Sequence, residues 1–107
     1  LHDYTISEFI PSKKYDAVWC CEFVEHVEEK YISNFLKTFE YAKYIIMTHA
    51  IPKQPGYHHV NCQSEEYWID KLANIKYSYN DYITKILRNL SKAIHSKRIL
   101  FFEKNNI

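Results

Sequence analysis

The sequence predicts a single α/β domain in which a mostly parallel, buried sheet is flanked by helices. Three observations carry this prediction. Strand-forming runs alternate with amphipathic helical segments along the chain. Two of those runs, 15–21 and 44–48, are apolar throughout, which is typical of strands buried on both faces. The length of 107 residues, with 47% hydrophobic and 25% charged residues, suits one globular domain rather than a disordered tail or a two-domain enzyme.

The first half of the chain predicts two strands separated by a helix. Residues 15–21 are rich in strand formers and are expected to form a buried strand, followed by a short helical turn over 22–27. Apolar residues recur at helical spacing between 29 and 43, which predicts a helix with one buried face. They are Ile32, Phe35, Leu36, Phe39 and Ala42. The run 44–48 predicts the second strand.

The second half predicts two more helices and two more strands after a loop marked by Pro52, Pro55 and Gly56. Ser64 is a good N-cap, and the acidic residues after it favour a helix that reaches about residue 74. A third strand is expected over 76–79. Asn80 or Asp81 then caps a last helix before a strand over 99–102. The apolar face of that helix is Ile83, Ile86, Leu87, Leu90 and Ile94.

Composition excludes several classes of function. Gly56 is the only glycine, so neither a Gly-x-Gly-x-x-Gly loop nor a Walker-type loop can be written in this chain. The 14 Lys and Arg residues against 13 Asp and Glu argue against a broad basic surface for nucleic acid, though not against RNA bound at a small site. The 3 cysteines, two of them adjacent, form a poor disulfide framework, which favours reduced thiols in the cytoplasm. No C-x-x-C pair is present, which argues against a cysteine-based zinc site. No apolar run approaches the ~20 residues of a membrane span.

The candidate functional residues follow the predicted strands, because sheets of this kind bind ligands beyond the carboxyl ends of their strands. Glu22 follows the first strand and His49 follows the second. Glu22, Glu25 and His26 form an E-x-x-E-H segment, whose spacing brings two carboxylates and an imidazole to one helical face. Three interpretations are open: a metal site for a hard or borderline ion, an acid/base pair beside a substrate, and a solvated helix start with capping acids.

A second group of candidates lies in the loop after Gly56. His58 and His59 are adjacent, which indicates either a weak metal site or a polar surface loop, because neighbouring side chains usually diverge. Together with Asn61 they are the residue types of a histidine–metal nuclease. That remains a minor alternative, since an ordinary capped helix follows and basic residues are not clustered nearby.

Several segments resemble class I S-adenosylmethionine-dependent methyltransferases. Residues 15–27, YDAVWCCEFVEHV, are similar to the fourth-strand motif of that family, in which Phe/Tyr-Asp and an apolar strand precede an acidic residue and Leu/Val-Glu-His-Val. Residues 42–49 sit where the fifth strand would fall. Residues 56–69 resemble the following loop and helix in a subset of bacterial and viral members. Residues 2–5 look like the stretch after the third strand, where members line the adenine pocket. The resemblance is close over 2–70 and extends further only in element order.

The resemblance implies a partial Rossmann-like methyltransferase sheet, from the fourth of seven strands onward, forming one partial domain over 1–107. In the family, the glycine-rich cofactor loop precedes the point that corresponds to Leu1, so we expect this chain to be the C-terminal, substrate-side part. The implied function is methyl transfer from S-adenosylmethionine to a small molecule or an RNA end. The alternative is a non-catalytic remnant or binding module of the same fold that has lost the cofactor.

The resemblance also assigns roles to residues. Glu22 and His26 are the expected catalytic residues, and the expected cofactor contacts are Asp3, Tyr4 and Cys21. Relatives with this E-x-x-E-H pattern that act on RNA 3′ ends or quinone precursors hold a divalent ion with a later histidine. The metal ligands implied here are Glu22, Glu25, His26 and His59, with His58 as the alternative to His59.

The resemblance also predicts partners. With the first three strands elsewhere, the strand over 15–21 becomes an exposed edge. We therefore expect the chain to associate either with the missing N-terminal half or with a second copy of itself. No membrane partner is expected, and the implied location is the cytoplasm.

Overall fold

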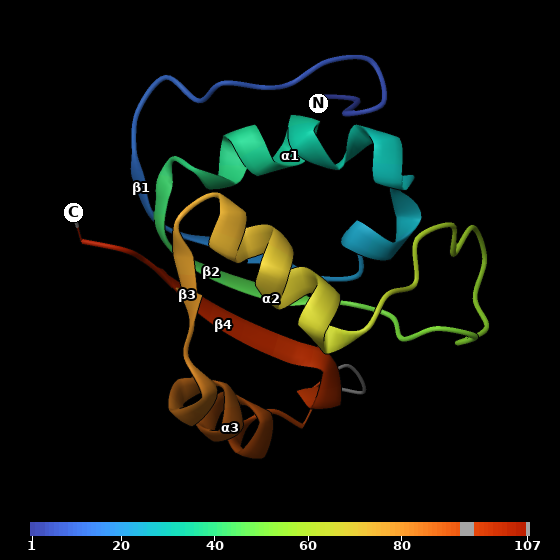
Figure 1. The fold of residues 1–107 in the computed structure, drawn as a ribbon, viewed down its shortest axis with the longest axis vertical. Coiled ribbons are helices and arrows are strands. Elements are labelled where there is room, and N and C mark those ends of the chain that lie inside the picture. Colours follow the sequence, from blue (N-terminus) through green and yellow to red (C-terminus); the bar gives the residue numbers. More distant parts are fainter. Residues whose placement is uncertain (93–95, 107) are drawn as a thin grey trace.

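Four strands form one mixed sheet in the computed structural model, which describes residues 1–92 and 96–106 (Figure 1). Their order across the sheet is β1-β2-β4-β3. The strands are β1 (Tyr15–Cys20), β2 (Ala42–Thr48), β3 (Tyr77–Tyr79) and β4 (Ile99–Lys104). Strand β1 runs parallel to β2, whereas β4 is antiparallel to both of its neighbours. The α/β fold is therefore confirmed, and the sheet is mixed: β1, β2 and β3 run in one direction, and β4 between β2 and β3 runs in the other. An apolar run indicates burial and carries no information on strand direction.

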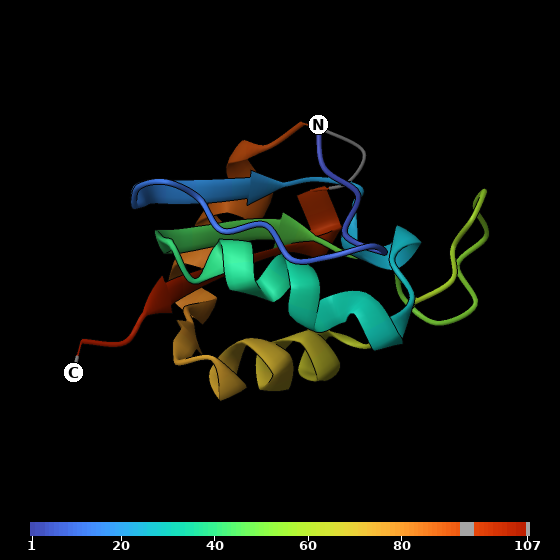
Figure 2. The ribbon, with the colours of Figure 1, turned by 90° about the horizontal axis from the view of Figure 1, so that it is seen from above.

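Helices cover both faces of the sheet unequally. The helices are α1 (Ile32–Phe39), α2 (Glu65–Asn74) and α3 (Asp81–Leu90). Three short 3₁₀ turns are η1 (Val24–His26), η2 (Glu29–Tyr31) and η3 (Ser96–Arg98). Figure 2 shows α1 and α2 on one face and α3 on the other. The long loop between β2 and α2 extends from the end of the sheet in both views.

Polar side chains cap two of the helices as the sequence predicts. The Ser64 hydroxyl accepts from the main-chain N–H of Tyr67 at 3.2 Å, which fixes the start of α2. Asn80, rather than Asp81, caps α3, because its side-chain oxygen accepts from the N–H of Ile83 at 2.9 Å. The helix predicted to reach residue 43 ends at Phe39 instead. The chain turns there, and Ala42 already pairs with Tyr15 in the sheet.

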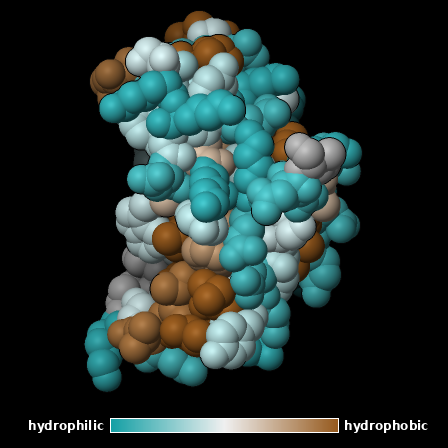
Figure 3. All heavy atoms as spheres, turned by 90° about the vertical axis from the view of Figure 1, so that its left-hand side faces the viewer, coloured by the Kyte–Doolittle hydropathy of each residue, from teal (hydrophilic) through white to brown (hydrophobic). Residues whose placement is uncertain are grey.

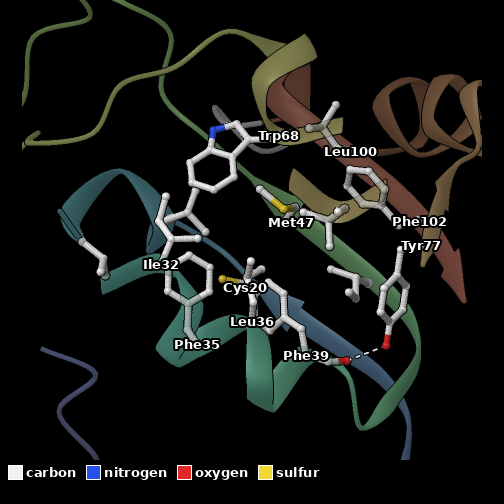
Figure 4. Packing of buried hydrophobic residues seen from close by; sticks show 14 residues of the cluster. Cys20, Ile32, Phe35, Leu36, Phe39, Met47, Trp68, Tyr77, Leu100 and Phe102 are labelled. Atoms are coloured by element: carbon white, nitrogen blue, oxygen red, sulfur yellow. Dashed lines mark hydrogen bonds between the residues drawn. The ribbon is translucent and has the colours of Figure 1, made fainter. Parts of the chain in front are cut away.

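The hydrophobic core lies between the sheet and the face covered by α1 and α2. Figure 4 shows Phe35 and Phe39 of α1 and Trp68 of α2 pointing onto the side chains of the strands. The fully buried Tyr77 hydroxyl donates to the main-chain carbonyl of Phe39 at 2.7 Å, so this core contains a satisfied polar group. The buried members are Cys20, Val24, Val27, Ile32, Phe35, Leu36, Phe39, Ile45, Met47, Trp68, Leu72, Tyr77, Leu100 and Phe102.

Strand β1 is an edge of the sheet, as the family resemblance predicts, so the prediction from its apolar sequence that it is buried is wrong. It pairs with β2 on one side only, and the side chains of Trp19 and Tyr15 are 59% and 49% exposed. Cys20 is buried in the core, whereas the adjacent Cys21 is exposed. An apolar sequence is therefore not sufficient evidence that both faces of this strand are covered within the chain.

The predicted apolar face of α3 is also largely uncovered. Only Thr84 of this helix is buried, and its hydroxyl accepts from the N–H of Phe101 in β4 at 3.0 Å. Ile86 and Leu90 remain exposed, and Ile94 lies outside the described residues. Figure 3 shows apolar side chains gathered at the lower end of the molecule, where α3 lies in Figure 1. No helix within residues 1–92 and 96–106 has both the length and the apolar character needed to span a membrane.

Candidate functional site

The candidate site lies at the carboxyl ends of β1 and β2, where the sequence predicts it. Glu22 follows β1 with a left-handed backbone, φ 54°. Its main-chain N–H donates to the Thr48 hydroxyl at 2.9 Å, which ties the ends of the two strands together. His49 follows Thr48 and is buried. Glu22 and His49 line the same pocket, so the expectation that polar residues converge after these two strands is confirmed.

Four potential metal ligands come together at this point. Glu22, Glu25, His26 and His59 each offer a ligand atom, and these atoms all lie within 4.8 Å of one another. The short turn η1 brings the first three together, and the loop before α2 supplies the fourth. They are the four residues that the sequence analysis proposed as ligands. The geometry selects His59 rather than His58, since His58 contributes a main-chain carbonyl to the ring of His26 and no ligand atom to the group.

Main-chain carbonyls orient both imidazole rings. His26 Nδ1 lies 3.0 Å from the carbonyl oxygen of His58, and His59 Nδ1 lies 3.3 Å from that of Gln54. A carbonyl only accepts hydrogen bonds, so Nδ1 is the donor in each ring. In the neutral imidazole, Nε2 then carries the lone pair, which is the arrangement found in histidines that bind metals. His26 Nε2 points toward Glu25, 3.8 Å from its Oε2.

The loop is fixed to η1 through Glu25. The main-chain carbonyl of Glu25 accepts from the N–H groups of Val60 and Asn61, both at 3.0 Å. The only glycine, Gly56, has a separate role in this loop. A Cβ atom added at Gly56 would collide with the ring of His59. A residue without a side chain at this position therefore allows the His59 imidazole to occupy its place in the cluster.

Glu25 is the most constrained member of the cluster. Its side chain is only 1% exposed, and its Oε1 is buried with no hydrogen-bond partner within the described part of the chain. Burial raises the pKa of Glu25, as do a side-chain hydrogen bond that protonated Glu25 donates to Glu22 and the negative charge of that residue. A buried carboxylate oxygen without a partner is unfavourable unless a proton or a cation compensates it. The orphaned oxygen therefore fits a site that holds a cation.

Donor chemistry narrows the type of ion. Two carboxylates and two imidazoles form a mixed oxygen and nitrogen set with no sulfur ligand. Such a set suits Mn²⁺, Fe²⁺, Zn²⁺ and, through the carboxylates, Mg²⁺. The residues present therefore fit a divalent cation.

The pocket beside the cluster has a volume of about 590 Å³. Its lining residues come from the cluster, from the loop before α2 and from η3. They are Glu22, His26, His49, Gln54, Pro55, Gly56, Tyr57, His59, Lys97 and Arg98. Burial lowers the pKa of His49, which favours the neutral form of this imidazole.

Lys97 and Arg98 are pocket residues that the sequence analysis missed. The reason is the direction of β4. Because β4 is antiparallel to β2, its first residue lies at the same end of the sheet as the last residues of β1 and β2. In the mostly parallel sheet that was expected, the residues before β4 would lie at the opposite edge. The sequence did contain one indication of these pocket residues: Lys97 and Arg98 are adjacent cations directly before the strand predicted over 99–102.

The residues expected on the cofactor side are only partly brought together. Asp3 and Tyr4 line a second pocket of about 460 Å³, and His26 lines both pockets. The carboxylate of Asp3 accepts from the main-chain N–H and the hydroxyl of Thr5, at 2.9 and 2.6 Å, which lowers its pKa. The third expected residue, Cys21, is exposed and lines neither of these pockets.

Comparisons with known proteins were made along three routes. Neither the protein-family models, nor the curated proteins, nor the solved structures give a significant match to this chain. The case for a function therefore depends on the residues and their geometry.

Proposed function

We propose that this chain is the substrate-side part of an S-adenosylmethionine-dependent methyltransferase and that it holds a divalent cation beside the methyl acceptor. The observation that carries the proposal is the ligand cluster. Glu22, Glu25 and His26 belong to the segment that resembles the family, and His59 is the later histidine that some relatives use. Their ligand atoms lie within 4.8 Å of one another.

The sheet is compatible with this proposal. The resemblance aligns β1 with the fourth of seven family strands, and the sheet contains four strands, the number needed to reach the seventh. The two pockets offer further support. The one lined by Asp3 and Tyr4 and the one beside the cluster share His26, so a cofactor in one and an acceptor in the other would be neighbours.

The mechanism follows from positioning. A bound divalent cation supplies Lewis acidity, which lowers the pKa of an acceptor hydroxyl and orients it. Glu25, His26 and His59 would hold the cation, so that the carboxylate of Glu22 beside it stays available for proton transfer. Glu22 is exposed at the pocket, and its backbone is fixed by Thr48, so its carboxylate is placed to take the proton of the acceptor. Methyl transfer itself depends mainly on alignment of the two reactants.

The metal part of the proposal is tested by binding of Mn²⁺, followed by electron paramagnetic resonance. The wild-type chain is expected to bind one Mn²⁺, and Glu25→Ala is expected to lose that binding. Glu66→Ala is the matched control, because Glu66 is an exposed carboxylate in the first turn of α2 and not part of the cluster. Mn²⁺ binding that is equal in Glu25→Ala and wild type contradicts the proposal.

The cofactor part is tested by nuclear magnetic resonance. Millimolar S-adenosylhomocysteine is expected to shift the amide resonances of residues 3–5 and of His26, which line the second pocket. Weak binding is expected, since no glycine-rich loop can be written in this chain. Unchanged spectra contradict the cofactor role. Metal binding without any such shift would favour the alternative, a binding module of the same fold that does not use the cofactor.

A further inference from the structure

The pocket beside the cluster carries charges of both signs. Glu22 and its neighbours supply the acidic part, and Lys97 and Arg98 of η3 supply two cations. Among the described residues, neither cation forms an ion pair with a carboxylate. Within residues 1–92 and 96–106, the hydrogen bond of the Arg98 guanidinium is a long one, 3.5 Å, to the main-chain carbonyl of Lys97. Two cations without acidic partners within the described residues therefore face the space of the pocket.

Two cations of α3 are compensated. Arg88 of α3 donates to Glu65 and to the carbonyl of Ile99, both at 2.9 Å. Lys85 pairs with Asp81 at 2.9 Å. Lys97 and Arg98 are the two cations among the described residues that line this pocket.

A buried polar group accompanies the two cations. His49 lines the same pocket with a side chain only 4% exposed, and its Nδ1 is buried with no hydrogen-bond partner within the described residues. Burial lowers the pKa of His49, and the nearby positive charge of Arg98 adds to this effect. The ring of His49 forms part of the pocket wall, and it also interacts with main-chain groups of Ala50 and Gln63.

We infer that the pocket takes a methyl acceptor that carries a phosphate group, with Arg98 and Lys97 holding the phosphate. The acidic cluster then faces the hydroxyl that receives the methyl group. Phosphate matches these residues because it has several strong acceptor oxygens, and because guanidinium and ammonium groups bind it with charge-assisted hydrogen bonds. The volume of about 590 Å³ is within the range of small-molecule sites. The assignment of a methyl acceptor rests on the proposed function; phosphate binding does not.

The test is a titration with uridine 5′-monophosphate, using uridine as the same molecule without phosphate. Both are followed by isothermal calorimetry and by amide shifts, with and without Mn²⁺. The monophosphate is expected to bind at least about tenfold more tightly than uridine, as charge-assisted hydrogen bonds allow. The dinucleotide uridylyl-uridine, which carries a phosphodiester, shows whether the site prefers a phosphodiester or the phosphomonoester of uridine 5′-monophosphate. If either phosphate compound binds more tightly than uridine, the inference is supported.

Variants assign the binding to named residues. Arg98→Gln and Lys97→Gln are each expected to weaken binding of the monophosphate about five- to tenfold, while uridine binding stays constant. Lys14→Gln is the matched control, because Lys14 is an exposed lysine just before β1, at the other end of that strand from the site. Unchanged thermal unfolding of each variant shows that the fold is retained.

Two results overturn the inference. One is equal affinity for uridine and both phosphate compounds. The other is wild-type affinity for the monophosphate in the Arg98→Gln, Lys97→Gln double variant. Failure of the proposed function gives a different result from failure of this inference. The wild-type chain would then bind no Mn²⁺, or show no amide shifts with S-adenosylhomocysteine, but would still bind the monophosphate more tightly than uridine. Phosphate binding with neither of those properties would support an anion site in a protein that is not a methyltransferase.

Discussion

At the residue scale, Glu25 dominates the energetics of the candidate site. Its buried Oε1 lacks a partner in the described structure, and its pKa is raised, chiefly by burial. The folded state therefore holds this proton more tightly than the unfolded state does. The unfolding free energy contributed by Glu25 falls as the pH rises above the ordinary value of 4.5. A cation in the site would remove this penalty.

The Glu25→Gln variant tests this reasoning through stability. Without divalent ions at pH 7, we expect the free energy of unfolding of Glu25→Gln to be about 1–3 kcal/mol larger than that of wild type, because the variant has no buried charge at this position. We also expect Mn²⁺ to raise the melting temperature of wild type and not that of the variant. Chemical denaturation at pH 5 and pH 7, with chelator or Mn²⁺, measures both. A variant less stable than wild type at pH 7 with chelator would count against the buried charge.

The two histidines of the loop provide a matched pair of variants. We expect His59→Asn to weaken Mn²⁺ binding at least about tenfold, because it removes a ligand atom. His58→Asn should leave Mn²⁺ binding unchanged, since only the main-chain carbonyl of His58 contacts His26. Asparagine tolerates the left-handed backbone at this position, φ 56°. Calorimetric titration of both variants decides the assignment; equal losses would show that the loop as a whole, rather than His59, governs binding.

At the element scale, α2 contributes through one large side chain. Trp68 is 0% exposed, and its ring lies 6.5 Å from that of Phe35 of α1. We expect Trp68→Ala to lower the unfolding free energy by about 3–5 kcal/mol, as large-to-small changes in cores do. Tyr82→Ala, at a residue that is 75% exposed on α3, is the control and should change it by less than about 0.5 kcal/mol. Urea denaturation measures both, and similar values for the two variants would contradict this view of the core.

Most elements could be predicted from the sequence because local chemistry determines them. The caps at Ser64 and Asn80 and the apolar spacing of α1 act within a few residues. The direction of β4 could not be predicted, because it depends on pairing with strands that are distant in the sequence. An apolar run does not specify that pairing. This single error also hid Lys97 and Arg98, which reach the pocket only because β4 is antiparallel. The ligand cluster was predictable because three of its four residues lie within five positions of one another.

At the scale of the whole molecule, the exposed edge of β1 is the main unsatisfied feature. The proposed partners, an N-terminal half or a second copy, would cover it, since an edge strand presents unpaired backbone groups. We expect the isolated chain to self-associate as its concentration rises. We expect Trp19→Lys to reduce this self-association, because Trp19 lies in β1 and is 59% exposed. Tyr82→Lys gives the same charge change on α3. Light scattering distinguishes the outcomes, and a monodisperse monomer at all concentrations contradicts the expectation.

One ring joins the two pockets of this molecule. Because His26 lines both, we expect a ligand that fixes this imidazole from one side to change the free energy of binding on the other. Thermodynamic reciprocity then requires a single coupling factor: whatever a metal does to the affinity for an adenosine-bearing ligand, that ligand does equally to the affinity for the metal. Measuring the affinity for each ligand in the absence and presence of the other would give this coupling free energy. A coupling that is lost when His26 is replaced would show that this ring links the two pockets.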